Sequence, residues 1–178
     1  MEKSNIVLIG MPASGKSTVG VVLAKILGLS FMDLDITIQN HMGTTLQRII
    51  DERGPEGFIE VENMVLSGLD CSNTVLATGG SAVYSDEAMR HLSEQGLVVY
   101  LEISYEGVAE RIGNLDVRGV VMRDDSVRTL RALYDERLPL YEKYAELTVD
   151  VDGLQIGESA VLVADAIRAC GGLEGRRT

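Results

Sequence analysis

The sequence lacks the features that would place the chain in a membrane or in an oxidising compartment. It has no apolar run of about 18 residues, the length that crosses a bilayer, so we expect no membrane span. The first ten residues are too poor in apolar side chains to form a signal peptide. Cys71 and Cys170 fit no metal or redox spacing, and we interpret them as buried, reduced thiols. These absences predict a cytoplasmic protein.

Aromatic residues are also scarce. They make up 4% of the chain, and Trp is absent, so the core must be built mainly from Val, Leu, Ile, Ala and Met. The length of 178 residues suits one domain, which at this size buries roughly 70% of the surface exposed by its unfolded chain. We expect a single domain over 1–170 and a frayed tail over 171–178.

Positive charge is in short supply and is unevenly placed. The chain has 16 basic and 27 acidic residues, a net charge of −11, which disfavours nucleic acid as a partner. Six arginines nevertheless fall between Arg111 and Arg137, and no lysine lies between Lys25 and Lys143. The arginines could build a local anion site or could lie on a solvated helix face with acidic partners, and composition leaves both open.

Strand-length apolar runs alternate with segments of helical period. We predict strands at 5–9, 29–34, 74–77, 97–103 and 147–151, and helices at 17–27, 36–51, 56–69, 86–94, 106–112, 126–138 (interrupted at Pro139 and resuming to about 144) and 159–169. Alternating strands and helices with nearly continuous Val, Ile and Leu in the strands indicate a parallel sheet covered on both faces. The fold class predicted is therefore three-layer α/β.

A phosphate-binding loop is the most specific motif. Residues 10–17 read GMPASGKS and match G-x4-G-K-[ST], with a predicted strand before them and a predicted helix after. Such a loop turns successive backbone N–H groups toward phosphate oxygens, places Lys16 near the terminal phosphates and offers the Ser17 hydroxyl to Mg2+. The alternative is an ordinary glycine-rich turn. We expect ATP to be bound by Gly10, Ala13, Ser14, Gly15, Lys16, Ser17 and Thr18.

Two aspartates close the second predicted strand. Asp33 and Asp35 are two residues apart, so both leave the same face at the carboxyl edge of the sheet, where open α/β sheets bind ligands. The alternative is an acidic pair that caps the next helix. The sequence contains no Asn-Lys-x-Asp element for guanine, and short chains that begin with a phosphate loop are typically small-molecule kinases.

The chain resembles the shikimate kinase family from about residue 5 to residue 169. The resemblance is carried by residues 10–17, Asp33-Leu34-Asp35, Phe58 with Glu62, Thr78-Gly79-Gly80, Arg111, Arg118, and Arg137 within ERLPLY. It implies a P-loop fold of nucleoside-monophosphate-kinase type, with five parallel strands in the order 2-3-1-4-5. It also implies a substrate-binding helical insertion over about 35–70 and a lid over about 113–125.

The resemblance assigns roles on the nucleotide side. It implies catalytic roles for Lys16, Asp35 and Arg118, and Mg2+ held by Ser17 and, through water, by Asp33. It further implies that Arg111 stacks on adenine and that the lid arginine Arg118 closes over the phosphates. Arg118 could instead be a solvated bystander, which is our interpretation of Arg123.

On the acceptor side, the resemblance points to Asp35, Ile59, Gly79, Gly80, Ser81 and Arg137. Arg137 falls on an apolar helix stripe, where a guanidinium needs an anionic partner, either the substrate carboxylate or an internal salt bridge. Gly79 and Gly80 could equally be a turn that ends a strand. Ile59 stands where the family usually has a carboxylate-binding arginine, Ser81 replaces a third glycine, and Gly119 replaces a proline.

The sequence therefore supports ATP- and Mg2+-dependent phosphorylation of shikimate by a protein that we expect to be monomeric. Ile59 motivates an alternative, a related kinase for a different small hydroxylated metabolite, but it is also compatible with a shikimate kinase that relies on Arg137 and a neighbour such as Arg48 or Arg53. A non-catalytic nucleotide-binding regulator is the third hypothesis.

Overall fold

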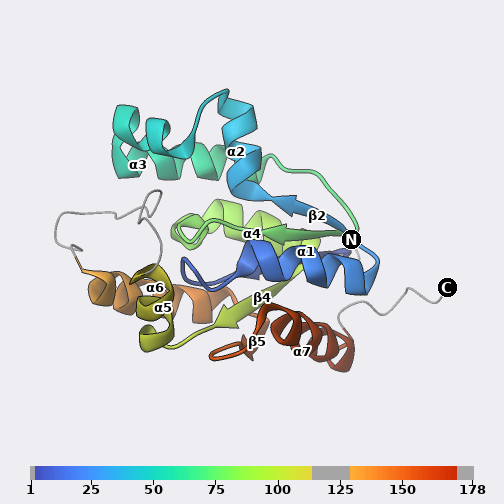
Figure 1. Cartoon of the computed structure of the whole chain (residues 1–178). Helices are drawn as coiled ribbons and strands as arrows, with labels where there is room; N and C mark the ends of the chain where they lie inside the picture. Colours follow the sequence, from blue (N-terminus) through green and yellow to red (C-terminus); the bar gives the residue numbers. More distant parts are fainter. Residues whose placement is uncertain (1–2, 114–128, 172–178) are drawn as a thin grey trace.

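The computed structural model describes residues 3–113 and 129–171. Its centre is a five-stranded parallel sheet in the order β2-β3-β1-β4-β5, which confirms the predicted topology (Figure 1). The strands are β1 (Asn5–Ile9), β2 (Ser30–Asp33), β3 (Thr74–Ala77), β4 (Gly96–Glu102) and β5 (Leu147–Asp150). The helices are α1 (Lys16–Leu27), α2 (Leu34–Met42), α3 (Leu46–Ser67), α4 (Asp86–Gln95), α5 (Tyr105–Gly113), α6 (Leu130–Tyr144) and α7 (Ile156–Ala169), with a 3-10 turn at Ala82–Tyr84.

The central strand β1 shows why both faces of the sheet are covered. Its side chains alternate, so that Ile6 and Leu8 enter one apolar cluster while Val7 and Ile9 enter another, and all four are fully buried. The helices α1 and α7 complete the first cluster. The second is completed mainly by α3, α4 and α6. The two clusters join the sheet to the helices on its two faces, which gives the three layers predicted from the sequence.

The parallel arrangement brings the functional segments to one edge. In a parallel sheet every strand ends on the same side, and ligands bind there. The phosphate loop follows β1, Asp33 ends β2, and Thr78, Gly79 and Gly80 follow β3. Two helices, α2 and α3, connect β2 to β3 and lie together beyond that strand pair (Figure 1).

Helix boundaries in this connection differ from the prediction. The helix predicted over 36–51 is wrong as a single element, since α2 ends at Met42 and α3 begins at Leu46. Gly43 adopts the left-handed conformation (φ 64°) that ends α2, and the Thr45 side chain caps α3 by accepting the Arg48 N–H. Gly54, at φ 72° and ψ 174°, is non-helical and separates two helical segments within α3, at the gap predicted between residues 51 and 56.

Two further expectations are corrected. Pro139 lies inside α6 and does not interrupt it, and Cys170 is exposed while Cys71 is half-buried, so the thiols are not both buried. No helix within 3–113 and 129–171 is long and apolar enough to cross a membrane. Arg118, Gly119 and Arg123, with nearly all of the predicted lid, lie outside the described residues, and the predictions on them stay predictions.

Candidate active site

The phosphate loop has the backbone of an anion cradle. Gly10, Ala13 and Gly15 all have positive φ, at 147°, 63° and 91°, and Gly15 is the N-cap of α1. Alternation of left- and right-handed residues turns backbone N–H groups toward one concavity, and the N-terminus of α1 adds its positive end. A side chain at Gly10 would also meet the Leu101 carbonyl oxygen at 2.7 Å, so the loop requires glycine there.

Lys16 folds back over this loop. Its Nζ donates to the carbonyl oxygens of Gly10 and Met11, each at 2.8 Å, and the residue is only 7% exposed. Burial lowers the pKa of Lys16 to about 8, although the nearby carboxylates of Asp35 and Asp33 favour its charged form. The ammonium group is therefore held at the mouth of the loop beside the two aspartates.

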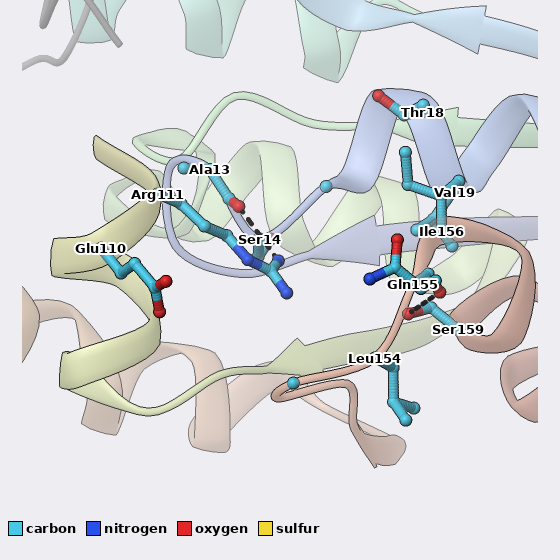
Figure 2. Close-up of a pocket in the computed structure, with 12 residues that line it drawn as sticks. Ala13, Ser14, Thr18, Val19, Glu110, Arg111, Leu154, Gln155, Ile156 and Ser159 are labelled. Carbon is cyan, nitrogen blue, oxygen red and sulfur yellow. Dashed lines mark hydrogen bonds between the residues drawn. The ribbon is translucent and has the colours of Figure 1, made fainter. Parts of the chain in front are cut away.

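A cavity of about 580 Å³ adjoins the outer side of the loop (Figure 2). It contains four of the predicted nucleotide-binding residues on the loop and α1, namely Ala13, Ser14, Gly15 and Thr18, together with Arg111 from α5. Arg111 Nη1 donates to the Ala13 carbonyl oxygen at 3.3 Å, which fixes the guanidinium against the loop. The structure thus brings these predicted residues together in one cavity.

The opposite wall of the cavity was missed by sequence reasoning. It consists of Gly153, Leu154, Gln155, Ile156 and Ser159, from the turn after β5 and the start of α7. Gln155 caps α7 in a reciprocal pair with Glu158, whose carboxylate accepts the Gln155 N–H at 2.9 Å. The one sequence signal for this wall was that the turn follows a predicted strand, since ligands bind at the carboxyl ends of parallel strands.

Asp33 caps helix α2, which was one of the two interpretations that the sequence left open. Its Oδ1 accepts the N–H groups of Asp35 at 3.0 Å and of Ile36 at 3.3 Å. Both bonds use Oδ1, so Oδ2 remains able to accept a bond from a metal-bound water. Ser17 is exposed in the first turn of α1. Among residues 3–113 and 129–171 no cluster of three His, Cys, Asp or Glu could hold a metal by itself. The residues therefore fit Mg2+ carried mainly by nucleotide phosphates and water.

Asp35 lies so close to Gly79 that any side chain at position 79 would displace the Asp35 carboxylate. A Cβ atom on Gly79 would lie 2.7 Å from Asp35 Oδ1 and 2.8 Å from Oε1 of Glu62. Burial is the main reason that the pKa of Asp35 is raised, followed by the charge of Asp33, while Lys16 opposes the rise. A carboxylate with a raised pKa is a stronger base, which suits acceptance of a proton from a hydroxyl.

Arg137 approaches the next glycine along. The residue is 1% exposed, and its Nη1 would lie 2.8 Å from a Cβ atom on Gly80. Its Nε donates to the Tyr84 hydroxyl at 3.1 Å, and its guanidinium carbon lies 5.1 Å from the centre of that ring. The Tyr141 hydroxyl donates to the Gly80 carbonyl oxygen at 2.8 Å. This cluster brings a buried cation to the same pair of glycines as Asp35, and Ser81 is buried next to them.

Glu62 is the functional candidate to which sequence reasoning gave no role. It is fully buried, and neither carboxylate oxygen has a hydrogen-bond partner within the part of the chain that the structure describes. Burial raises its pKa to about 7, and the Asp35 charge adds to the rise. Ser81 and Arg137 are close enough to oppose it, but neither makes a hydrogen bond of normal geometry to it.

Ile59 lies on a different cavity. It lines a space of about 240 Å³ with Glu60, Asn63 and the first turn of α4, and it packs partly buried against the core. The structure therefore brings Asp35, Gly79 and Arg137 together, while the prediction that Ile59 contacts the acceptor stays a prediction.

Comparison with known proteins gives a consistent result. The family model described as shikimate kinase matches residues 12–168. A shikimate kinase of Vibrio vulnificus (strain YJ016) is 39% identical over 167 residues, covering 93% of this chain and 95% of the relative. The structure of a shikimate kinase from Acinetobacter baumannii in complex with shikimate matches with a TM-score of 0.84 and 32% identity, covering 94% of each chain. A thymidylate kinase from Candida albicans, with a TM-score of 0.56 and 15% identity, shares the fold.

Proposed function

This chain belongs to the shikimate kinase family, and from that premise we propose that it transfers the γ-phosphate of ATP to a hydroxyl of shikimate. The observation that carries the proposal is the convergence of Lys16, Asp35 and Arg137 at one edge of the sheet, between a phosphate loop and two closely approached glycines. A phosphate donor and a carboxylate-bearing acceptor would meet at that edge.

The nucleotide side is a proposal built on the loop and the adjoining cavity. The loop residues Gly10, Ala13, Ser14, Gly15, Lys16, Ser17 and Thr18 would hold the ATP phosphates, and Arg111 would pack against the base. Arg111 already lies in the cavity, fixed to the loop through Ala13. Ser17 and Asp33 would hold Mg2+, directly and through water respectively. When bound, Mg2+ supplies charge neutralisation on the phosphates.

The acceptor side places a base next to an anion-binding group. Asp35 would orient the attacking hydroxyl and take its proton as the oxygen bonds to the γ-phosphorus. The bond to the β–γ bridging oxygen breaks, and ADP leaves. Arg137 would bind the shikimate carboxylate, with the backbone of Gly79, Gly80 and Ser81 lining the site. A guanidinium that is 1% exposed beside a glycine suits a planar carboxylate.

Three further proposals, on domain organisation, the lid and the state of the protein in the cell, rest on the resemblance to the family. Residues 1–170 would act as one domain in which about 35–70 form the acceptor-binding insertion, residues 113–125 a lid, and 171–178 a frayed tail. Arg118 would complete the site from the lid by stabilising charge on the transferred phosphoryl group. We expect the protein to be a cytoplasmic monomer.

A second candidate rests on Ile59. Without an arginine there, the acceptor site has one fewer cation for a carboxylate, which favours a less anionic hydroxylated metabolite as acceptor. The third hypothesis, a regulator without transfer activity, is disfavoured because Lys16 and Asp35 are both retained.

A coupled assay of ADP release against a panel of acceptors separates these candidates. We expect ADP release to require Mg2+ and to be fastest with shikimate. A faster reaction with another hydroxylated metabolite would support the second candidate, and ATP binding without turnover on any acceptor would support the regulator.

A further inference from the structure

Glu62 is a buried acid in an unusual situation. It lies on α3 with 0% exposure, and both of its carboxylate oxygens lack a hydrogen-bond partner among the described residues. A buried charge without a partner is strongly disfavoured, so such a group is retained as a neutral acid or is completed by something that binds. Its Oε1 faces the space above Gly79, where Asp35 Oδ1 also lies.

The groups around Glu62 come from several elements. Asp35 on α2 is its acidic neighbour, Arg137 and Tyr141 on α6 face it, and Ser81 precedes the 3-10 turn. The first turn of α4 carries Asp86 and Glu87, which are exposed. Among the described residues, Arg137 is the cation that acts on Glu62, while Lys16 is the cation beside Asp35. Arg137 would therefore face both Glu62 and the carboxylate of an acidic acceptor.

The sequence of α3 explains why Glu62 has no dedicated cation. Residues three apart on a helix are close enough for their side chains to pair, and the residue three before Glu62 is the apolar Ile59. Between residues 55 and 67 α3 carries no basic residue. Earlier in the helix, Arg48 is engaged with Glu52 at 2.7 Å on the exposed surface.

We propose that Glu62 is a specificity-determining residue of the acceptor site, which accepts a carboxylate-bearing acceptor while Glu62 is a neutral acid and rejects it once Glu62 is ionised. The inference rests on the proposed function and deepens it. Two carboxylates that approach one point do not both ionise readily, and an anionic acceptor would add a third negative charge beside Arg137. A neutral Glu62 can instead donate a hydrogen bond toward Asp35 or an acceptor oxygen.

The consequence is a particular dependence of acceptor affinity on pH. Because burial raises the pKa of Glu62 to about 7, the neutral form is lost as the pH rises through neutrality. The KM for shikimate should therefore rise with pH, while kcat at saturating shikimate should change much less. Shikimate itself carries its carboxylate charge throughout this range, so a change in the acceptor does not produce the effect.

The test measures KM and kcat for shikimate at saturating ATP and Mg2+ between pH 6 and pH 9. For the wild-type protein we expect KM to rise about tenfold for each pH unit above neutrality, until it reaches the KM of the protein with ionised Glu62. Glu62→Gln, which stays neutral, should have a flat KM profile. Glu60→Gln is the matched control, since Glu60 is exposed on the same helix, and it should retain the wild-type profile.

A second variant, Ile59→Arg, covers the case in which Glu62→Gln does not fold. It gives Glu62 a cation at i−3, so KM should fall at pH 8 and lose most of its pH dependence. This inference alone is overturned if the wild type turns over shikimate and Glu62→Gln shows the same dependence of KM on pH as the wild type. If only Ile59→Arg folds, the same comparison is made between that variant and the wild type. Absence of shikimate-dependent turnover in the wild type overturns the proposed function and the inference together.

Discussion

Oδ1 of Asp33 accepts a hydrogen bond from the backbone N–H of Asp35 at 3.0 Å, so the side chain of Asp33 holds the backbone of Asp35 in place. The cap starts α2 at the end of β2, and it thereby sets the direction in which Asp35 leaves the sheet edge. The two interpretations of this pair, helix cap and chemical site, are compatible because Asp33 performs the first with one oxygen.

Asp33→Asn separates these two roles. Asparagine is as good an N-cap as aspartate, so the melting temperature should change little. Loss of the negative charge should raise the Mg2+ concentration required for half-maximal activity by about tenfold. Asp33→Ala is the control that loses both, and it should also cost about 1 kcal/mol of unfolding free energy. An unchanged Mg2+ requirement in Asp33→Asn would remove Asp33 from the metal site.

Lys16→Met should abolish most phosphoryl transfer without unfolding the protein. The ammonium is buried against the loop carbonyls, and Met has a similar length without the cost of burying a charge. We expect kcat to fall by about 10²- to 10³-fold with no loss of thermal stability. Lys25→Met is the matched control, since Lys25 lies in the exposed last turn of the same helix and should leave kcat near the wild-type value.

ATP affinity should weaken at alkaline pH. The pKa of Lys16 in the free protein is about 8, so above that value a growing fraction of the protein must take up a proton before it can bind phosphate. The Kd for ATP should rise by up to tenfold per pH unit above about 8, and calorimetry at several pH values measures it. Lys16→Met should bind more weakly but without this slope. Equal wild-type affinities at pH 7 and pH 9 would argue against the role of the ammonium.

Arg137→Lys should impair acceptor binding even though it keeps the charge. A lysine cannot present the planar pair of donors that suits a carboxylate, nor can it keep the bond from Nε to Tyr84. We expect the KM for shikimate to rise at least about tenfold. Arg131→Lys, on the exposed face of the same helix and paired with Asp135, serves as the control and should leave KM unchanged. If both variants behave alike, Arg137 is a structural residue.

The sheet could be predicted closely because its signals are local. β1 and β3 were predicted at their observed bounds, since each is a short apolar run that ends at a glycine-containing turn. The break at Gly43 was missed because the helical period continues on both sides of it. The non-helical residue Gly54, by contrast, falls in the gap predicted between residues 51 and 56. At both positions a glycine with positive φ interrupts the helical backbone.

The candidate site was predictable to the extent that it follows motifs. The loop, Asp35, Gly79 and Arg137 could be named from the sequence, and they lie at one sheet edge. The turn at Gly153 follows a predicted strand, but only the fold shows that it faces the phosphate loop. The isolation of Glu62 was equally hidden, since it depends on which side chains surround it after packing.

The transfer itself is tested most directly by phosphorus NMR of the protein incubated with ATP, Mg2+ and shikimate. We predict a new phosphomonoester resonance on shikimate that grows in step with ADP and is absent when shikimate is omitted. ADP accompanied by inorganic phosphate alone, or a resonance that does not depend on shikimate, would contradict the assignment.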